Sequence, residues 1–205
     1  MNCPKIKNIK DIEFFTKGKR GFLYTGSYKG DKVVIKIKNP ESKAQNRIEN
    51  EIKFLEILNR NNIGPKLLLK GKDYFAYRFI EGDFFPKFIQ ENSKKEILKI
   101  VKRIFNQMFI LDEIKINKEE MHHPHKHIII NKKDRPVLID FERCHYTPKP
   151  KNVTQFCNYM ISTFVSEIFK SKGILLDKSK IIGLEKTYKK DMNKENLTNI
   201  IDAIK

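Results

Sequence analysis

Hydrophobic and polar residues alternate near the N-terminus of the chain, over residues 14–38, and glycines interrupt the pattern. Alternation with a period of two and glycines in between predicts antiparallel strands joined by tight turns. Two β-branched runs, 128–130 and 136–139, flank the polar residues 131–135 and predict a second β-hairpin. The run 74–80 leads to Gly82 and predicts another strand that ends in a turn.

Apolar residues recur at helical spacing in four other stretches. The first predicted helix runs from Ser42, its expected N-cap, to Asn59. Its apolar face consists of Ala44, Ile48, Leu55 and Leu58. The other helices are expected over 96–113, from Asn152 through Ile168, and over about 178–205. In the helix 96–113 the expected buried residues are Ile97, Ile100, Val101, Ile104, Met108 and Leu111.

Composition narrows the class of protein. The 205 residues are 40% hydrophobic, which suits a globular chain of one domain or two small lobes. The formal net charge of +17 predicts an acidic partner: a nucleotide, a nucleic acid or an acidic protein. Because lysine is spread along the whole chain, a solvated lysine-rich surface of the kind found in heat-adapted proteins explains the charge equally well.

The three cysteines have no CxxC spacing, which argues against a disulfide framework and for a reducing compartment. The N-terminal residues lack an apolar leader segment, and no apolar run approaches the length of a membrane span. We therefore expect a cytoplasmic protein without a membrane partner.

One charged residue occupies a position that the pattern assigns to a buried face, and a second ends an apolar strand. Glu51 lies on the apolar face of the first helix, between Ile48 and Leu55. Lys36 ends the apolar run 33–35, and we expect it to pair with Glu51. The alternatives are an ordinary edge-strand lysine and a glutamate at the rim of the apolar face.

Further candidates for binding chemistry are Asp140 and two glycines. Asp140 follows four apolar residues, so its charge needs a compensating partner, and a divalent cation is one candidate. Gly18 and Gly21, with Lys17, Lys19 and Arg20 around them, would let backbone N–H groups approach a phosphate. Glycines in a hairpin are more often simply turn residues.

Histidines are concentrated in one tract and allow a different hypothesis, a zinc site. The spacing matches no tight zinc pattern, and solvated loop histidines are the simpler explanation. The potential ligands are His122, His123, His125, His127, Cys144 and His145.

The order of these features resembles the protein-kinase-like superfamily over roughly residues 14–170. Val33–Lys36 resembles the Val-Ala-Ile-Lys strand of kinases, and Asp140–Glu142 resembles Asp-Phe-Gly with glutamate in place of glycine. The nearest members are minimal archaeal and atypical kinases, including RIO-type proteins. The resemblance implies an α+β fold with two lobes, an antiparallel β-sheet N-lobe (1–82) and a truncated, mainly helical C-lobe (83–205), within one kinase-like domain.

The resemblance also implies roles for single residues. Lys36 would hold the ATP phosphates, Glu51 would orient Lys36, and Asp140 would bind Mg²⁺. Tyr77 falls at the gatekeeper position at the end of the adenine pocket. The remaining residues implied in nucleotide binding are Gly18, Gly21, Leu23, Val34, Arg78 and Ile80.

The catalytic loop departs from the family pattern. Thirteen positions before Asp140, where the family has a metal-binding asparagine, this chain has His127. Because Mg²⁺ prefers oxygen ligands, His127 would either leave this metal site weak or favour Mn²⁺. Five positions earlier, where the catalytic aspartate belongs, stands His122. Glu120 is the nearest acid, so we expect Glu120 to act as the base, with His122 as the alternative.

The resemblance therefore implies an ATP-dependent kinase that transfers the γ-phosphoryl group to a hydroxyl, that of Ser or Thr in a protein substrate. Because the catalytic-loop aspartate is absent, a nucleotide-binding pseudokinase or scaffold is the alternative. The positive charge also leaves association with RNA or a ribonucleoprotein open.

Overall fold

The structure is a computed structural model and describes residues 4–18, 21–39 and 46–205. The described chain is α+β and divides into two compact units. The first unit takes in the described residues up to Glu81 together with Leu138–Arg143. The second unit comprises Gly82–Val137 and Cys144–Lys205. Residues 138–143 thus belong to the first unit, whereas the sequence pattern suggested a simple division near Gly82.

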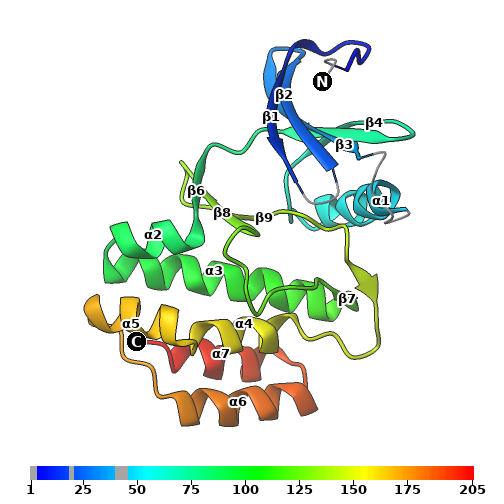
Figure 1. The fold of residues 1–205 in the computed structure, drawn as a ribbon. Coiled ribbons are helices and arrows are strands. Elements are labelled where there is room, and N and C mark those ends of the chain that lie inside the picture. Colours follow the sequence, from blue (N-terminus) through cyan, green and yellow to red (C-terminus); the bar gives the residue numbers. More distant parts are fainter. Residues whose placement is uncertain (1–3, 19–20, 40–45) are drawn as a thin grey trace. The chain divides into compact units, whose positions relative to one another are not determined.

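The first unit is built on a five-stranded antiparallel sheet with the strand order β1-β2-β3-β5-β4. One helix, α1, packs against β3, β4 and β5 of this sheet (Figure 1). The elements are β1 (Lys10–Lys17), β2 (Gly21–Tyr28), β3 (Asp31–Lys38), α1 (Arg47–Arg60), β4 (Leu67–Lys70) and β5 (Tyr74–Arg78).

Alternation along β3 gives the sheet two different faces. Val33 and Ile35 point to one face, where they form a buried apolar cluster with Ile9, Tyr24 and Ala76. Val34 and Lys36 point to the opposite face. The face with Lys36 is therefore available to α1.

Helix α1 begins at Arg47, after Asn46 in the left-handed conformation (φ 55°), which asparagine tolerates better than most residues. The predicted N-cap Ser42 and the apolar Ala44 lie outside the described residues, as do Lys19 and Arg20 of the glycine turn and Cys3. The predicted helical phase is correct, because Ile48, Leu55 and Leu58 are buried together with Glu51 and Phe54.

The second unit is mainly helical and carries two small sheets. The three-stranded sheet has the order β6-β8-β9, and β7 pairs with β10. Its helices are α2 (Phe85–Glu91), α3 (Lys94–Glu113), α4 (Asn152–Met160), α5 (Thr163–Ser171), α6 (Lys178–Lys190) and α7 (Lys194–Asp202). Its strands are β6 (Gly82–Phe84), β7 (Ile116–Asn117), β8 (Ile128–Asn131), β9 (Pro136–Leu138) and β10 (His145–Tyr146).

Helix α3 is the central helix of this core, and all six apolar residues predicted for its inner side are buried. Phe105 adds a seventh and meets the Phe156 ring of α4 at a centroid distance of 4.9 Å. The side chain of Ser93 and that of Glu96 form a capping box at the start of α3, two residues before the predicted start.

Several predicted boundaries in this unit are wrong. The helix expected from Asn152 through Ile168 is two helices, because the Ser162 side chain caps a new helix by accepting from Val165 N. The region 178–205 is likewise divided, since Asn193 caps α7. Helix α2 was not predicted. Among the described residues, no helix has the length and apolar character needed to cross a membrane.

Candidate functional site

Lys36 is the centre of a charged cluster in the first unit. Its Nζ lies 2.6 Å from Glu51 Oε2, 3.2 Å from Asp140 Oδ1 and 3.3 Å from Glu142 Oε2. The expected contact between Lys36 and Glu51 is therefore present. Three elements far apart in the sequence, a strand, a helix and the segment after β9, meet at one ammonium group.

Glu51 connects all three elements. One of its carboxylate oxygens binds Lys36, and the other, Oε1, accepts a hydrogen bond from Phe141 N at 3.2 Å. Glu51 is almost fully buried, so both interactions are shielded from water. The same side chain thus positions the strand lysine and the Asp-Phe-Glu segment.

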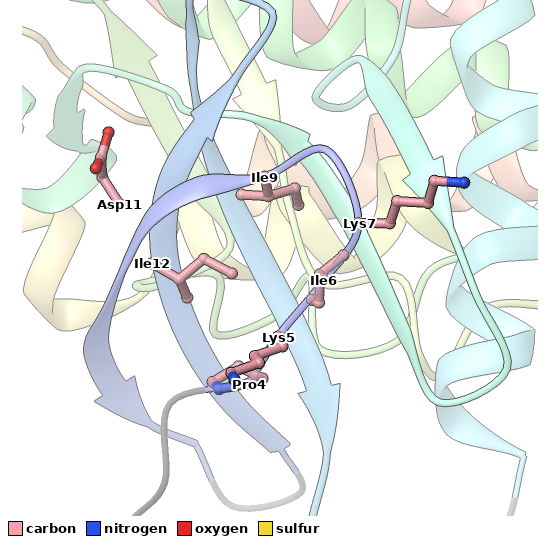
Figure 2. Close-up of a pocket in the computed structure, with 7 residues that line it drawn as sticks. All are labelled: Pro4, Lys5, Ile6, Lys7, Ile9, Asp11 and Ile12. Atoms are coloured by element: carbon pink, nitrogen blue, oxygen red, sulfur yellow. The ribbon is translucent and has the colours of Figure 1, made fainter.

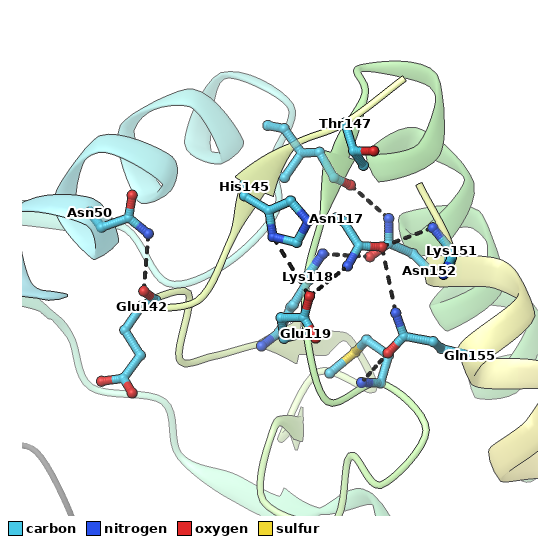
Figure 3. A network of polar contacts seen from close by, with 12 residues as sticks. Asn50, Asn117, Lys118, Glu119, Glu142, His145, Thr147, Lys151, Asn152 and Gln155 are labelled. Carbon is cyan, nitrogen blue, oxygen red and sulfur yellow. Dashed lines mark hydrogen bonds and ion pairs between the residues drawn. The ribbon is translucent and has the colours of Figure 1, made fainter. Parts of the chain in front are cut away.

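The backbone of the Asp-Phe-Glu segment is held by α1. Arg47 Nη1 and Asn50 Nδ2 both donate to the carbonyl oxygen of Glu142, at 3.2 Å and 3.0 Å. Figure 3 shows the Asn50 contact. Asp140 adopts the left-handed conformation with φ 63°, outside strand β9. The predicted hairpin strand therefore ends before Asp140; α1 holds the backbone of the two residues that follow, and the Asp140 carboxylate contacts Lys36 of β3.

Glu142 is the member of the cluster that the sequence pattern missed. It was noted only as a replacement for the family's glycine, yet its carboxylate is buried and faces Lys36. A glutamate directly after an apolar Phe141 was the available signal, because buried carboxylates require a partner.

The cluster contains three carboxylates and one lysine, so negative charge exceeds positive charge. This excess shifts the pKa values of Lys36 and Glu51. Burial by itself would lower the pKa of Lys36, but Glu51, Asp140 and Glu142 outweigh it and raise that pKa above the ordinary value. Burial raises the pKa of Glu51, Asp140 and Glu142 add to the rise, and Lys36 opposes it. The ammonium is therefore firmly charged, while the carboxylates compete for it.

The same carboxylates form a candidate metal site. One oxygen from each of Glu51, Asp140 and Glu142 lies within 4.8 Å of the others. Oxygen donors of this kind suit Mg²⁺ or Mn²⁺, so the donor set fits the predicted cation chemically. The predicted second metal ligand, His127, belongs to the second unit.

Other residues predicted to contact a nucleotide share the sheet face that bears Lys36. Leu23 lies directly opposite Lys36 across β2 and β3. Val34 lies opposite Tyr77 across β3 and β5. Directly opposed residues in an antiparallel pair point to the same side of the sheet. The side chains of Leu23, Val34, Lys36 and Tyr77 therefore lie on one face.

Arg78 and Ile80, also predicted to bind the nucleotide, lie at the end of β5 and just after it. The N–H of Arg78 donates to Lys66 O at 2.9 Å, and its guanidinium pairs with Asp31 at 2.7 Å. The Arg78 N–H group is thus used within the fold and is no donor for a ligand. Ile80 follows β5 outside any strand.

Gly18 and Gly21, the two glycines predicted to approach a phosphate, each have a role in the sheet itself. Gly18 N donates to Gly21 O at 2.9 Å and closes the turn between β1 and β2. A Cβ on Gly21 would lie 2.8 Å from Ile37 O, so the close approach of β2 and β3 requires glycine there. Both glycines are therefore explained by contacts within the sheet, without a phosphate.

Two predicted residues of the catalytic loop contact each other in the second unit. Glu120 Oε2 lies 3.6 Å from His127 Nε2, and Glu120 has the left-handed φ of 72°. The exposed His122 lies against Gln155, with 3.4 Å between Nδ1 and Oε1. Glu120 is thus oriented by His127, and His122 by helix α4.

A polar network that the sequence pattern missed anchors the chain just before Glu120 (Figure 3). Asn152 Oδ1 accepts from Lys118 N at 2.8 Å, and Asn117 Oδ1 accepts from Lys151 N at 2.8 Å. Glu119 Oε1 contacts Asn117 Nδ2 at 3.3 Å and His145 Nδ1 at 3.7 Å. Reciprocal bonds of this kind fix strand β7 to the start of α4.

Beneath this network, Asp112 of α3 caps α4. Its buried carboxylate accepts from the backbone N–H groups of Asn152 and Val153 and from the Tyr188 hydroxyl. Burial raises the pKa of Asp112, and these hydrogen bonds oppose the rise. The signal in the sequence was an aspartate next to Leu111 on the apolar side of a helix.

The zinc hypothesis finds no geometric support. Within residues 4–18, 21–39 and 46–205, the acidic group around Lys36 is where three potential metal-binding side chains converge, and no histidine belongs to it. Cys144 and Cys157 are buried free thiols. The histidine tract is better explained by its contacts with α4 and α5, where His125 packs on Tyr159 and Phe164.

The first unit also contains a cavity of about 430 Å³ near its N-terminus (Figure 2). None of the predicted site residues lines it. The lining residues are Pro4, Lys5, Ile6, Lys7, Ile9, Asp11 and Ile12.

Comparison of the chain with protein-family models and with curated proteins finds no match. The geometry of these side chains is therefore the basis on which a function can be proposed.

Proposed function

We propose that the chain is an ATP-dependent kinase that transfers the γ-phosphoryl group to a hydroxyl, that of serine or threonine in a protein. The observation that supports the proposal is the cluster around Lys36. A strand lysine contacts a helix carboxylate 15 residues away and an aspartate 104 residues away. This combination of lysine, helix glutamate and aspartate is the arrangement that the kinase resemblance predicts.

The proposed reaction is a direct transfer. The substrate hydroxyl oxygen attacks the γ-phosphorus, the bond to the bridging oxygen between the β- and γ-phosphates breaks, and ADP leaves. Lys36 would bind the phosphates, and Glu51 would keep Lys36 oriented. Mg²⁺ (or Mn²⁺), when bound, would neutralise phosphate charge, and Asp140 and Glu142 would offer it carboxylate oxygens. The hydroxyl proton would pass to Glu120, which is the proposed base.

One observation favours a pseudokinase as the second candidate. The Glu120 carboxylate faces His127, so the proposed base and the proposed second metal ligand contact each other. A carboxylate that already contacts another side chain is less free to reach the substrate hydroxyl, and a general base must lie within hydrogen-bond reach of the proton it takes. In a pseudokinase the first unit would bind the nucleotide without transfer.

Nucleotide binding is tested by thermal denaturation. ATP with Mg²⁺ should raise the melting temperature, because a ligand that binds the folded state stabilises it by mass action. Lys36→Ala should abolish most of this rise. Lys70→Ala is the matched control, since Lys70 is an exposed lysine on β4 that pairs with Glu56. A melting temperature unchanged by ATP in the wild type would refute the proposal.

Transfer is tested with γ-labelled ATP and a protein substrate. Asp140→Ala should abolish labelling, and Glu120→Gln should strongly reduce it while ATP affinity changes little, because loss of a base acts on the transition state. If His122→Ala abolishes labelling and Glu120→Gln does not, His122 is the base. If ATP binds and no label is transferred with Mg²⁺ or Mn²⁺, the pseudokinase is the correct candidate.

A further inference from the structure

Glu142 makes a contact that the proposed function does not need. Its side chain stands where the related kinases have a glycine, and its carboxylate lies 3.3 Å from Lys36 Nζ. The residue is buried, and Arg47 and Asn50 hold its carbonyl oxygen. Because the backbone is held at this point, the side chain has a fixed starting position beside Lys36.

All donor capacity of Lys36 is used within the cluster. An ammonium group has three N–H donors, and Lys36 has three carboxylate acceptors: Glu51, Asp140 and Glu142. A phosphate oxygen can therefore bind Lys36 only if one carboxylate moves away. Glu51 has the shortest contact, at 2.6 Å, and is also held by Phe141 N. Asp140 and Glu142 have longer contacts, at 3.2 Å and 3.3 Å.

The negative charge of the three carboxylates also opposes the binding of a phosphate to Lys36. A nucleotide phosphate placed on Lys36 would lie among three carboxylates, and like charges in a shielded site repel strongly. A divalent cation bound by Asp140 and Glu142 would remove the repulsion and draw the Glu142 carboxylate away from the ammonium. Cation binding and phosphate binding should therefore favour each other.

We propose that the Glu142 carboxylate occupies the nucleotide-phosphate position on Lys36 and yields it when a divalent cation binds. The inference rests on the proposed nucleotide-binding function and adds a device to it: Glu142 makes nucleotide affinity depend on the divalent cation. Glu142 is thus a positioning residue for Lys36.

The test measures ATP affinity by isothermal titration calorimetry, once in EDTA and once in saturating Mg²⁺. Glu142→Gln removes the charge, keeps the side-chain length and leaves the carbonyl contacts with Arg47 and Asn50 in place. We expect its cation-free ATP affinity to rise about tenfold over the wild type, a usual size for coupling between two ligands. In saturating Mg²⁺ the gain should be much smaller. Glu49→Gln, an exposed position on the same helix, removes the same charge and should change neither affinity.

Each outcome decides between the inference and the function on which it rests. If the wild type binds ATP with Mg²⁺ but Glu142→Gln shows no cation-free gain, the inference is wrong and the proposed function stands. If Glu142→Gln binds ATP more weakly in both conditions, Glu142 assists phosphate binding instead of competing with it, and the inference is again wrong. If Glu142→Gln and Glu49→Gln gain equally, net charge alone is responsible. If neither the wild type nor either variant binds ATP, the proposed function fails and the inference fails with it.

Discussion

At the scale of single residues, Lys36 is the charge that makes the buried cluster possible. The side chains of Glu51 and Glu142 are exposed by only 5% and 10%, so little water reaches their carboxylates. Removal of one partner from a buried ion pair leaves an uncompensated charge, and this costs more than the pair contributes when intact. The stability of the first unit should therefore depend on Lys36 even without any ligand.

Lys36→Met should lower the free energy of unfolding by about 3 kcal/mol at neutral pH. The loss should grow as the pH rises above 4.5, the ordinary pKa of Glu51. Without Lys36 the pKa of folded Glu51 rises further, so the folded variant holds a proton that the unfolded chain releases above pH 4.5. Urea denaturation between pH 4 and pH 8 measures this dependence.

Lys36→Met/Glu51→Gln is the control for this prediction, because the double variant also removes one of the uncompensated carboxylates. It should recover part of the loss. A pH-independent loss in Lys36→Met would mean that packing, and not charge, accounts for the effect of Lys36.

At the scale of elements, the turn between α1 and β4 determines where Phe141 packs. Gly64 has a positive φ of 82°, and a Cβ there would lie 2.9 Å from both Leu55 Cδ1 and Phe141 Cε2. The turn therefore leaves space for the Phe141 ring, and Phe141 N in turn binds Glu51. A glycine in the turn after α1 thus helps to place the Asp-Phe-Glu segment.

Gly64→Ala should destabilise the protein by about 3 kcal/mol, because left-handed strain and a clash in a packed core add together. Gly30→Ala is the matched substitution, since Gly30 has a φ of 84° and nothing within 4 Å of its hypothetical Cβ. It should cost only about 1 kcal/mol. Equal losses in urea denaturation would show that the Phe141 ring adjusts freely.

At the scale of the whole molecule, charge is the dominant property. The chain has 42 Lys and Arg residues against 25 Asp and Glu residues, so repulsion between surface charges opposes the folded state at neutral pH. Most of the described lysines are exposed and are therefore open to screening by salt.

Raising NaCl from low to physiological concentration at pH 7 should stabilise the protein by about 1 kcal/mol, because screening weakens this repulsion. The gain should vanish near pH 9.7, where the net charge approaches zero. Thermal denaturation at the two pH values provides the comparison. A salt effect of the same size at both would show that repulsion between like charges is not its cause.

The sequence by itself determined which side of α1 and of α3 is buried. Helical spacing placed Glu51 with Ile48 and Leu55 on the buried face of its helix, and Lys36 was the charge that ended the apolar run 33–35. Side-chain direction follows from local backbone geometry, with periods of 2 and 3.6 residues, so neighbouring residues contain this information. The contact between Lys36 and Glu51 could be predicted because Glu51 was a carboxylate on a buried helix face and Lys36 was the cation at the end of the preceding apolar strand.

Only the tertiary structure decided which distant segments meet. It assigned residues 138–143 to the first unit, turned Glu142 toward Lys36, and joined Asp112, Asn117 and Asn152 into one network. Asp140 lies 104 residues from Lys36 in the sequence. The periodicity of side chains within one helix or strand carries no information about a contact between residues so far apart. These contacts depend on how whole elements pack and on which buried polar groups find partners, and both are properties of the folded chain.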